Sequence, residues 1–282
     1  MRILIVGASG FTGSYLKKVF SAYEIIGTSI SDNSYLKLDL SDKNNIKNIF
    51  KKYNPNIICI PAYKGGMDYI EENPQETRVI NVESIKLIVD LILKDSLLIY
   101  YSSDAVFKGD RGPYSENDTI QPQSEYGKQK LDAEKIVKKH RRHLIIRTCS
   151  VYGWDPKRLN FVARLIDTIK ENKEFEAPID QFYTPTYIKD LANATKFLVE
   201  INKTGTYHVA GNEFISRYEL GKKVCDVFKL KKEKLTSVNS KQLKQIAPRA
   251  TKGGLKNLKI LKEGFKFHTL TEGLQDMLKE DL

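Results

Sequence analysis

Tyrosine, lysine and serine residues in the middle of the chain have a spacing that suits proton transfer. Tyr126 and Lys130 lie four residues apart in the helix-like segment YGKQKLDAEKIVKK, so the phenol and the ammonium share one helix face. A free tyrosine, with a pKa of about 10, is a poor acid–base catalyst at neutral pH. We expect the ammonium to favour the phenolate and to lower the pKa of Tyr126. Ser102 and Ser103 precede this helix at the end of an apolar strand and could supply hydroxyl groups to the same site.

A glycine-rich turn opens the chain and makes this spacing more informative. Gly7, Gly10 and Gly13 of GASGFTG follow the first apolar strand and lead into a helix, with Phe11 and Thr12 between the last two glycines. Such glycines let backbone N–H groups approach a pyrophosphate at the helix N-terminus. The turn therefore predicts a dinucleotide cofactor bound by these five residues.

The end of the second strand indicates which dinucleotide is preferred. An acidic residue there would bind the adenosine ribose and repel a 2′-phosphate. The chain has Thr28 and Ser29 instead, which favours NADP(H), although NAD(H) stays possible because no arginine follows. Asp39 and Leu40 end the third strand, where they could meet the adenine or belong to a helix N-cap region.

Short apolar runs alternate with helix-period segments over the first 150 residues, which predicts an α/β fold with a parallel sheet. We expect a dinucleotide-binding domain at 1–157, to which 181–210 returns, and a smaller substrate-binding region at 158–282. The expected strands are 3–6, 24–28, 35–38, 57–60, 97–102, 144–148 and 206–209. The expected helices are 12–21, 43–52, 74–94, 126–139, 159–172 and 187–201.

The charge of the chain is uneven. Its formal net charge is +11, and thirteen Lys or Arg between residues 220 and 262 face only Asp226 and Glu233. This excess suggests an anionic ligand near the C-terminal part, with a solvated lysine-rich surface or nucleic acid as the alternatives. We do not expect nucleic acid, because aromatic side chains are not interleaved with these lysines.

Cysteine content and hydropathy indicate the cellular compartment of the protein. Cys59, Cys149 and Cys225 lie in apolar or helical contexts, which predicts free thiols in a reducing cytoplasm. The sequence contains no CxxC motif and no cluster of histidines that would predict a metal site. No apolar run approaches the roughly 20 residues that cross a bilayer, and the N-terminus lacks a signal-peptide layout, so no membrane partner is expected.

These motifs together resemble the extended short-chain dehydrogenase/reductases, most of all the dTDP-4-dehydrorhamnose reductase family. The matching segments run nearly end to end and include GASGFTG, PAYKGGMDYIEENPQETRVIN, YYSSDAVFKGDRGPYSE, QPQSEYGKQKLDAEK, IIRTCSVYG, DQFYTPTYIKDLA, GTYHVAG and APRATKGGL. The resemblance implies a Rossmann-type doubly wound parallel sheet with a smaller C-terminal substrate-binding cap. It also implies a homodimer.

The resemblance assigns roles to the catalytic residues. Tyr126 would donate a proton to the C4 carbonyl oxygen of a 4-keto-6-deoxy nucleotide sugar as hydride arrives from the nicotinamide. Lys130 would hold the nicotinamide ribose, and Ser103 would hydrogen-bond the carbonyl oxygen. Further positions matching cofactor-binding segments are Ser102, Pro61, Ala62 and Tyr63, and those matching substrate-binding segments are Asp104, Ser150, Asn160, Phe161 and Arg249.

Several of these positions have a structural alternative or depart from the family. Asn160 could cap a helix, Arg249 could be a surface cation, and Asp104 could contact substrate or hold its loop. Ser150 stands where the family tends to have an aromatic platform, and Ala105 replaces a tyrosine. The alternatives to a reductase are a nucleotide-sugar epimerase or dehydratase, and a non-catalytic NADP-binding subunit resembling the regulatory subunit of methionine adenosyltransferase.

Overall fold

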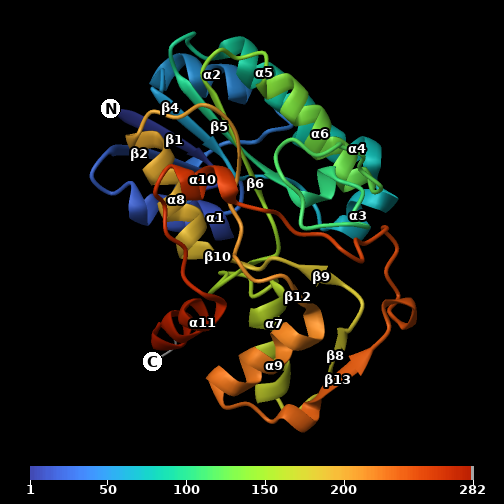
Figure 1. The fold of residues 1–282 in the computed structure, drawn as a ribbon. Coiled ribbons are helices and arrows are strands. Elements are labelled where there is room, and N and C mark those ends of the chain that lie inside the picture. The colour runs from blue at the N-terminus through green and yellow to red at the C-terminus, as the bar shows by residue number, and fades with distance from the viewer. Residues whose placement is uncertain (281–282) are drawn as a thin grey trace.

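A parallel β-sheet forms the centre of the computed structural model, which describes residues 1–280 (Figure 1). Seven strands lie in the order β11-β6-β5-β4-β1-β2-β3, and every neighbouring pair is parallel. The expected α/β fold with a parallel sheet is therefore confirmed. The strands are β1 (Arg2–Val6), β2 (Glu24–Ser29), β3 (Leu36–Lys37), β4 (Ile57–Ile60), β5 (Leu97–Ser103), β6 (His143–Thr148) and β11 (Gly205–His208).

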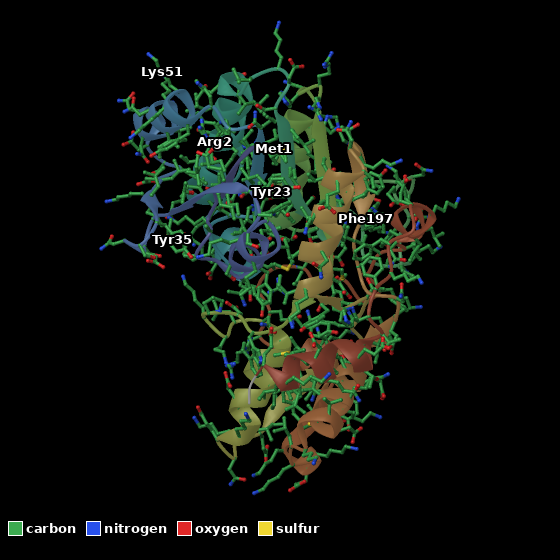
Figure 2. The ribbon with its side chains drawn as sticks, turned by 90° about the vertical axis from the view of Figure 1, so that its left-hand side faces the viewer. Met1, Arg2, Tyr23, Tyr35, Lys51 and Phe197 are labelled. Carbon is green, nitrogen blue, oxygen red and sulfur yellow. The ribbon has the colours of Figure 1, made fainter. Side chains whose placement is uncertain are left out.

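Helices cover both faces of the sheet because its strands are apolar on both sides. One core cluster packs beneath α1 (Phe11–Val19) and α8 (Ile188–Glu200), and a second packs beneath α2 (Lys43–Tyr53), α5 (Ser84–Leu91) and α6 (Glu125–Val137). Figure 2 shows Lys51 of α2 and Phe197 of α8 on opposite sides of the molecule, with Arg2 of β1 between them.

The single helix expected at 74–94 is wrong in detail. The chain forms α3 (Met67–Glu72) and α4 (Pro74–Arg78), then a π-helical turn at Val79–Glu83, before α5 begins. Pro74 starts a new helix since its ring suits a first turn. The wider turn carries Asn81, whose buried amide bonds the backbone of Lys64 and the side chain of Gln129. The turn thereby ties the loop after β4 to α6.

A smaller lobe extends from the carboxyl ends of the strands (Figure 1). It contains α7 (Phe161–Lys170) and α9 (Arg217–Phe228), which pack on the parallel pair β8 (Phe175–Pro178) and β13 (Leu235–Val238). Short pairs join the lobes, namely β7 (Val151–Tyr152) with β10 (Thr186–Tyr187) and β9 (Phe182–Tyr183) with β12 (Ile215–Ser216). The last helices are α10 (Leu258–Lys262), against β11, and α11 (Leu270–Lys279), against α9. The domain boundary at residue 157 stays a prediction.

Within residues 1–280 no helix is long and apolar enough to cross a membrane. The same residues contain no group of three His, Cys, Asp or Glu side chains that could hold a metal ion. Cys59, Cys149 and Cys225 are free and buried.

Candidate active site

The glycine turn after β1 has no room for side chains. Gly7 has a φ of +84°, and a Cβ on Gly13 would lie 2.1 Å from the carbonyl oxygen of Gly7. Gly10 occupies the N-cap of α1 and offers no side-chain cap, so the first N–H groups of that helix stay available to a ligand. The turn lies at the point where the strand order reverses, between β1 and β4. Backbone donors at a switch point fit the pyrophosphate of a dinucleotide.

The loop after β4 lies directly against this turn. A Cβ on Gly7 would be 2.9 Å from the Cβ of Ala62. Pro61 and Ala62 are partly buried beside the turn, and Tyr63 is 49% exposed at the edge of a cavity. Ala62 therefore lies against the turn that the sequence predicts to bind the cofactor, and Tyr63 lies between this turn and the cavity.

The hydroxyl groups at the end of β2 are bonded within the protein. Thr28 is fully buried, and its hydroxyl donates to the carbonyl of Ile5 and accepts from the N–H of Gly7, so it holds the glycine turn. The Ser29 hydroxyl lies 2.8 Å from that of Ser9, a residue the sequence analysis passed over. No carboxylate ends β2, so this edge lacks the usual partner of a free ribose diol.

Asp39 and Leu40 follow the short strand β3. The carboxylate of Asp39 accepts from the N–H and hydroxyl of Ser41, which lowers the pKa of Asp39. The backbone N–H of Asp39 donates to the side chain of Asn45. These contacts favour the structural alternative for Asp39, while the helix cap itself is Asp42.

Tyr126 lies in the first turn of α6, close to the loop after β5. A Cβ on Gly127 would be 2.2 Å from the carbonyl oxygen of Ala105, so only glycine allows α6 to approach this closely. Burial raises the pKa of Tyr126 well above its ordinary value, and the nearby Ser103 hydroxyl opposes that effect. The expectation of a lowered pKa is therefore wrong in this structure.

The position of Lys130 explains why the pKa of Tyr126 is not lowered. Its Nζ donates to the backbone oxygen of Tyr101 at 2.8 Å and lies 5.8 Å from the ring centre of Tyr126, instead of reaching the phenol oxygen. The Nζ is closer to the ring centre of Tyr63, at 4.8 Å. Burial lowers the pKa of Lys130 to about 7, and the charge of Glu134 opposes that effect.

Asp104 organises the loop that carries Ser103. Its Oδ1 accepts from the Ser103 hydroxyl at 3.0 Å, and its Oδ2 accepts from the Cys149 thiol at 3.1 Å and from the N–H of Gly254 at 3.0 Å. These bonds favour the loop-holding alternative for Asp104. The Ser102 hydroxyl is buried and has no hydrogen-bond partner among the described residues, and Ser102 does not line the cavity described below.

A cavity of about 680 Å³ separates the sheet from the smaller lobe. Residues from both lobes line it. The predicted catalytic and substrate residues that the structure brings together on its wall are Ser103, Asp104, Tyr126, Ser150, Asn160, Phe161 and Arg249. Lys130 lies behind this wall, 6% exposed.

Three of these residues also have structural roles. Asn160 is the N-cap of α7, accepting from the N–H of Ala163 and donating to the carbonyl of Gly153. The guanidinium of Arg249 pairs with Asp68 at 2.8 Å. Ser150 has a φ of +45°, an uncommon backbone conformation for a serine.

The whole chain matches the family described as the RmlD substrate binding domain, over residues 1–282. The chain belongs to this family. The dTDP-4-dehydrorhamnose reductase of Aggregatibacter actinomycetemcomitans is 29% identical over 237 residues, 80% of this chain and 78% of that protein. The methionine adenosyltransferase 2 subunit beta of Pongo abelii is 30% identical over 242 residues, 81% of this chain and 72% of that protein.

Solved structures agree with the family assignment. The dTDP-4-dehydrorhamnose reductase of Bacillus anthracis, in complex with NADP, superposes with a TM-score of 0.91 at 27% sequence identity. The similarity covers 99% of each chain, so it extends over the sheet and the smaller lobe of this family member alike.

Sequence reasoning missed several cavity residues of this RmlD family member. They are Asp68, Arg164, Gln181, Tyr183, Arg217 and Lys244. Arg217 lies just before the basic stretch at 220–262, and its neighbours in SRYE carry no motif. Only the fold brings it to the cavity.

Proposed function

We propose that the protein is an NADP(H)-dependent reductase that converts a 4-keto-6-deoxy nucleotide sugar to the corresponding hydroxy sugar. The observation that carries the proposal is the presence of Tyr126 and Ser103 together on the wall of a large cavity, in a chain whose first strand ends in a glycine turn suited to a dinucleotide. Similarity to two dTDP-4-dehydrorhamnose reductases, one of them in complex with NADP, supports the substrate class and the cofactor.

Tyr126 carries its proton at neutral pH, as the reductive direction requires. Burial raises the pKa of Tyr126 further, so the phenol stays protonated, but burial does not make it a stronger acid. On substrate binding the Ser103 hydroxyl would turn its single proton from the Asp104 carboxylate to the carbonyl oxygen, while Asp104 keeps its bonds to Cys149 and Gly254. Lys130 would hold the ribose next to the nicotinamide, which supplies the hydride when the cofactor is bound.

The NADP(H) preference rests on the end of β2. Ser9 and Ser29 carry hydroxyl groups there, which can donate to a 2′-phosphate. NAD(H) is the second cofactor in our proposal. The cofactor positions are the glycine turn with Phe11 and Thr12, Thr28, Ser29, Asp39, Leu40, Pro61, Ala62, Tyr63, Ser102, Tyr126 and Lys130.

A regulatory subunit without turnover is the second candidate, favoured by the 30% identity to methionine adenosyltransferase 2 subunit beta. The two candidates separate in one assay. Purified protein is mixed with NADPH or NADH and with 4-keto-6-deoxy sugars linked to dTDP, UDP or GDP, and cofactor oxidation is followed by absorbance. If the protein is a reductase, we expect it to consume NADPH with the keto sugars of one nucleotide class. Binding of NADPH without consumption on every sugar would favour the regulatory candidate.

The cellular setting is part of the same proposal. The free, buried Cys59, Cys149 and Cys225 support a reducing cytoplasm. A homodimer through helices of the sheet domain follows by analogy with the family, and light scattering after size-exclusion chromatography tests it. A mass of one chain, 32.3 kDa, would contradict the dimer.

A further inference from the structure

Arg217 begins α9 and presents its guanidinium to the cavity. Its charged group lies 4.8 Å from the ring centre of Phe161 and 4.7 Å from that of Tyr183. Its backbone N–H donates to the carbonyl of Gln181, which fixes the start of the helix against β9. All four residues line the cavity.

The charge of Arg217 is not compensated by a carboxylate. Among residues 1–280 it forms no ion pair and its guanidinium has no hydrogen-bond partner, although the side chain is partly buried. Arg249, the arginine that the family resemblance points to, pairs with Asp68 instead. A partly desolvated guanidinium with five free N–H donors favours an anionic ligand.

The position of Arg217 matches one part of the substrate. Arg217 lines the same cavity as Ser103 and Asp104. A Cβ on Gly253 would lie 2.9 Å from Oδ2 of Asp104 and 3.1 Å from the ring of Tyr183, so the ring that contacts Arg217 is close to the loop that carries Ser103. In a nucleotide sugar the diphosphate is attached at C1, across the hexose ring from a C4 ketone. With the ketone at Ser103, the diphosphate therefore extends across the cavity toward the smaller lobe.

We propose that Arg217 is the principal anchor of the substrate diphosphate, ahead of Arg249, and this inference rests on the proposed function. Contacts with Phe161 and Tyr183 hold the planar guanidinium so that its edge faces the cavity and forms two parallel bonds to phosphate oxygens. A lysine at this position keeps the charge but loses the fork and the stacking.

Calorimetric titration of the NADPH-loaded protein tests the inference. The probes are dTDP, UDP and GDP, each with its matched nucleoside. In Arg217→Met we expect the best diphosphate to bind about 10- to 100-fold more weakly, the scale of lost charged hydrogen bonds, while the nucleoside binds unchanged. Arg217→Lys should recover part of this loss, and Arg249→Met should lose less than Arg217→Met.

Lys222→Met is the matched control. Lys222 lies on the same helix, outside the cavity, and pairs with Glu219, so the variant removes one charge without touching the site. It should bind the diphosphate within about twofold of wild type. The inference is overturned if Arg217→Met keeps the preference for diphosphate over nucleoside, or if no diphosphate binds the wild-type protein.

The inference and the proposed function fail separately. Wild-type turnover with an unchanged KM in Arg217→Met would overturn the role of Arg217 and leave the reductase standing. Diphosphate binding that depends on Arg217, in a protein that reduces no keto sugar, would overturn the reductase and leave the anchor standing. Circular dichroism of each variant shows whether the fold is intact.

Discussion

Charged side chains are paired differently in the sheet domain and around the cavity. Beneath the sheet, Arg147 and Glu134 form a two-bond ion pair at 2.8 and 2.7 Å, with 1% and 0% of the side chains exposed. Around the cavity, Arg249 pairs with a partly exposed Asp68 through one atom, and Arg217 has no carboxylate partner among residues 1–280. The buried ion pair of the sheet domain is satisfied within the protein, whereas Arg217 at the cavity is left without a carboxylate partner in the described part of the chain and can bind an anionic ligand.

The largest expected effect comes from breaking the ion pair beneath the sheet. Glu134→Gln leaves the guanidinium of Arg147 buried without its carboxylate, which should lower the free energy of unfolding by about 3–5 kcal/mol. Asp68→Asn is the matched variant at the cavity, where solvent reduces the effect to about 0–1 kcal/mol. Urea unfolding of both variants measures the contrast, and equal losses would contradict it.

The next effect is expected from a substitution in the glycine turn. Gly13→Ala forces a Cβ against the carbonyl oxygen of Gly7, and overpacking of this kind costs about 1–3 kcal/mol. NADPH binding should be lost with it, since the backbone donors shift. Gly66 has no atom within 4 Å of an added Cβ, so Gly66→Ala should bind NADPH as wild type does. Fluorescence titration with NADPH checks both variants.

A pH-dependent effect on stability concerns the buried ammonium of Lys130. Its pKa falls from 10.5 to about 7 on folding, so the unfolded chain binds more protons than the native protein between those values. Wild-type stability therefore rises with pH across this interval, by at most about 1.4 kcal/mol per pH unit. Lys130→Met lacks this term, and its stability relative to wild type should fall as pH rises. Urea unfolding across the interval tests the sign, and a pH-independent difference would contradict it.

The sheet could be predicted from local patterns, and the cavity could not. Each strand and the glycine turn consist of consecutive residues, so the apolar runs and the motif GASGFTG were enough to predict them. The cavity wall combines residues from 63 to 250 that no spacing connects. Arg217 therefore escaped notice, and the Asp68 partner of Arg249 and the Lys130 contact with Tyr101 needed the fold, whereas the helix cap of Asn160 was open to the sequence as an alternative.

Substitution of the two neighbouring tyrosines tests the central claim most directly. The rings of Tyr126 and Tyr63 lie 5.8 Å apart and both line the cavity, but of the two only Tyr126 has its pKa affected by the Ser103 hydroxyl. With the best keto sugar, kcat of Tyr126→Phe should fall at least about 100-fold and that of Tyr63→Phe less than about 10-fold. Full activity in Tyr126→Phe would contradict its role as the proton donor.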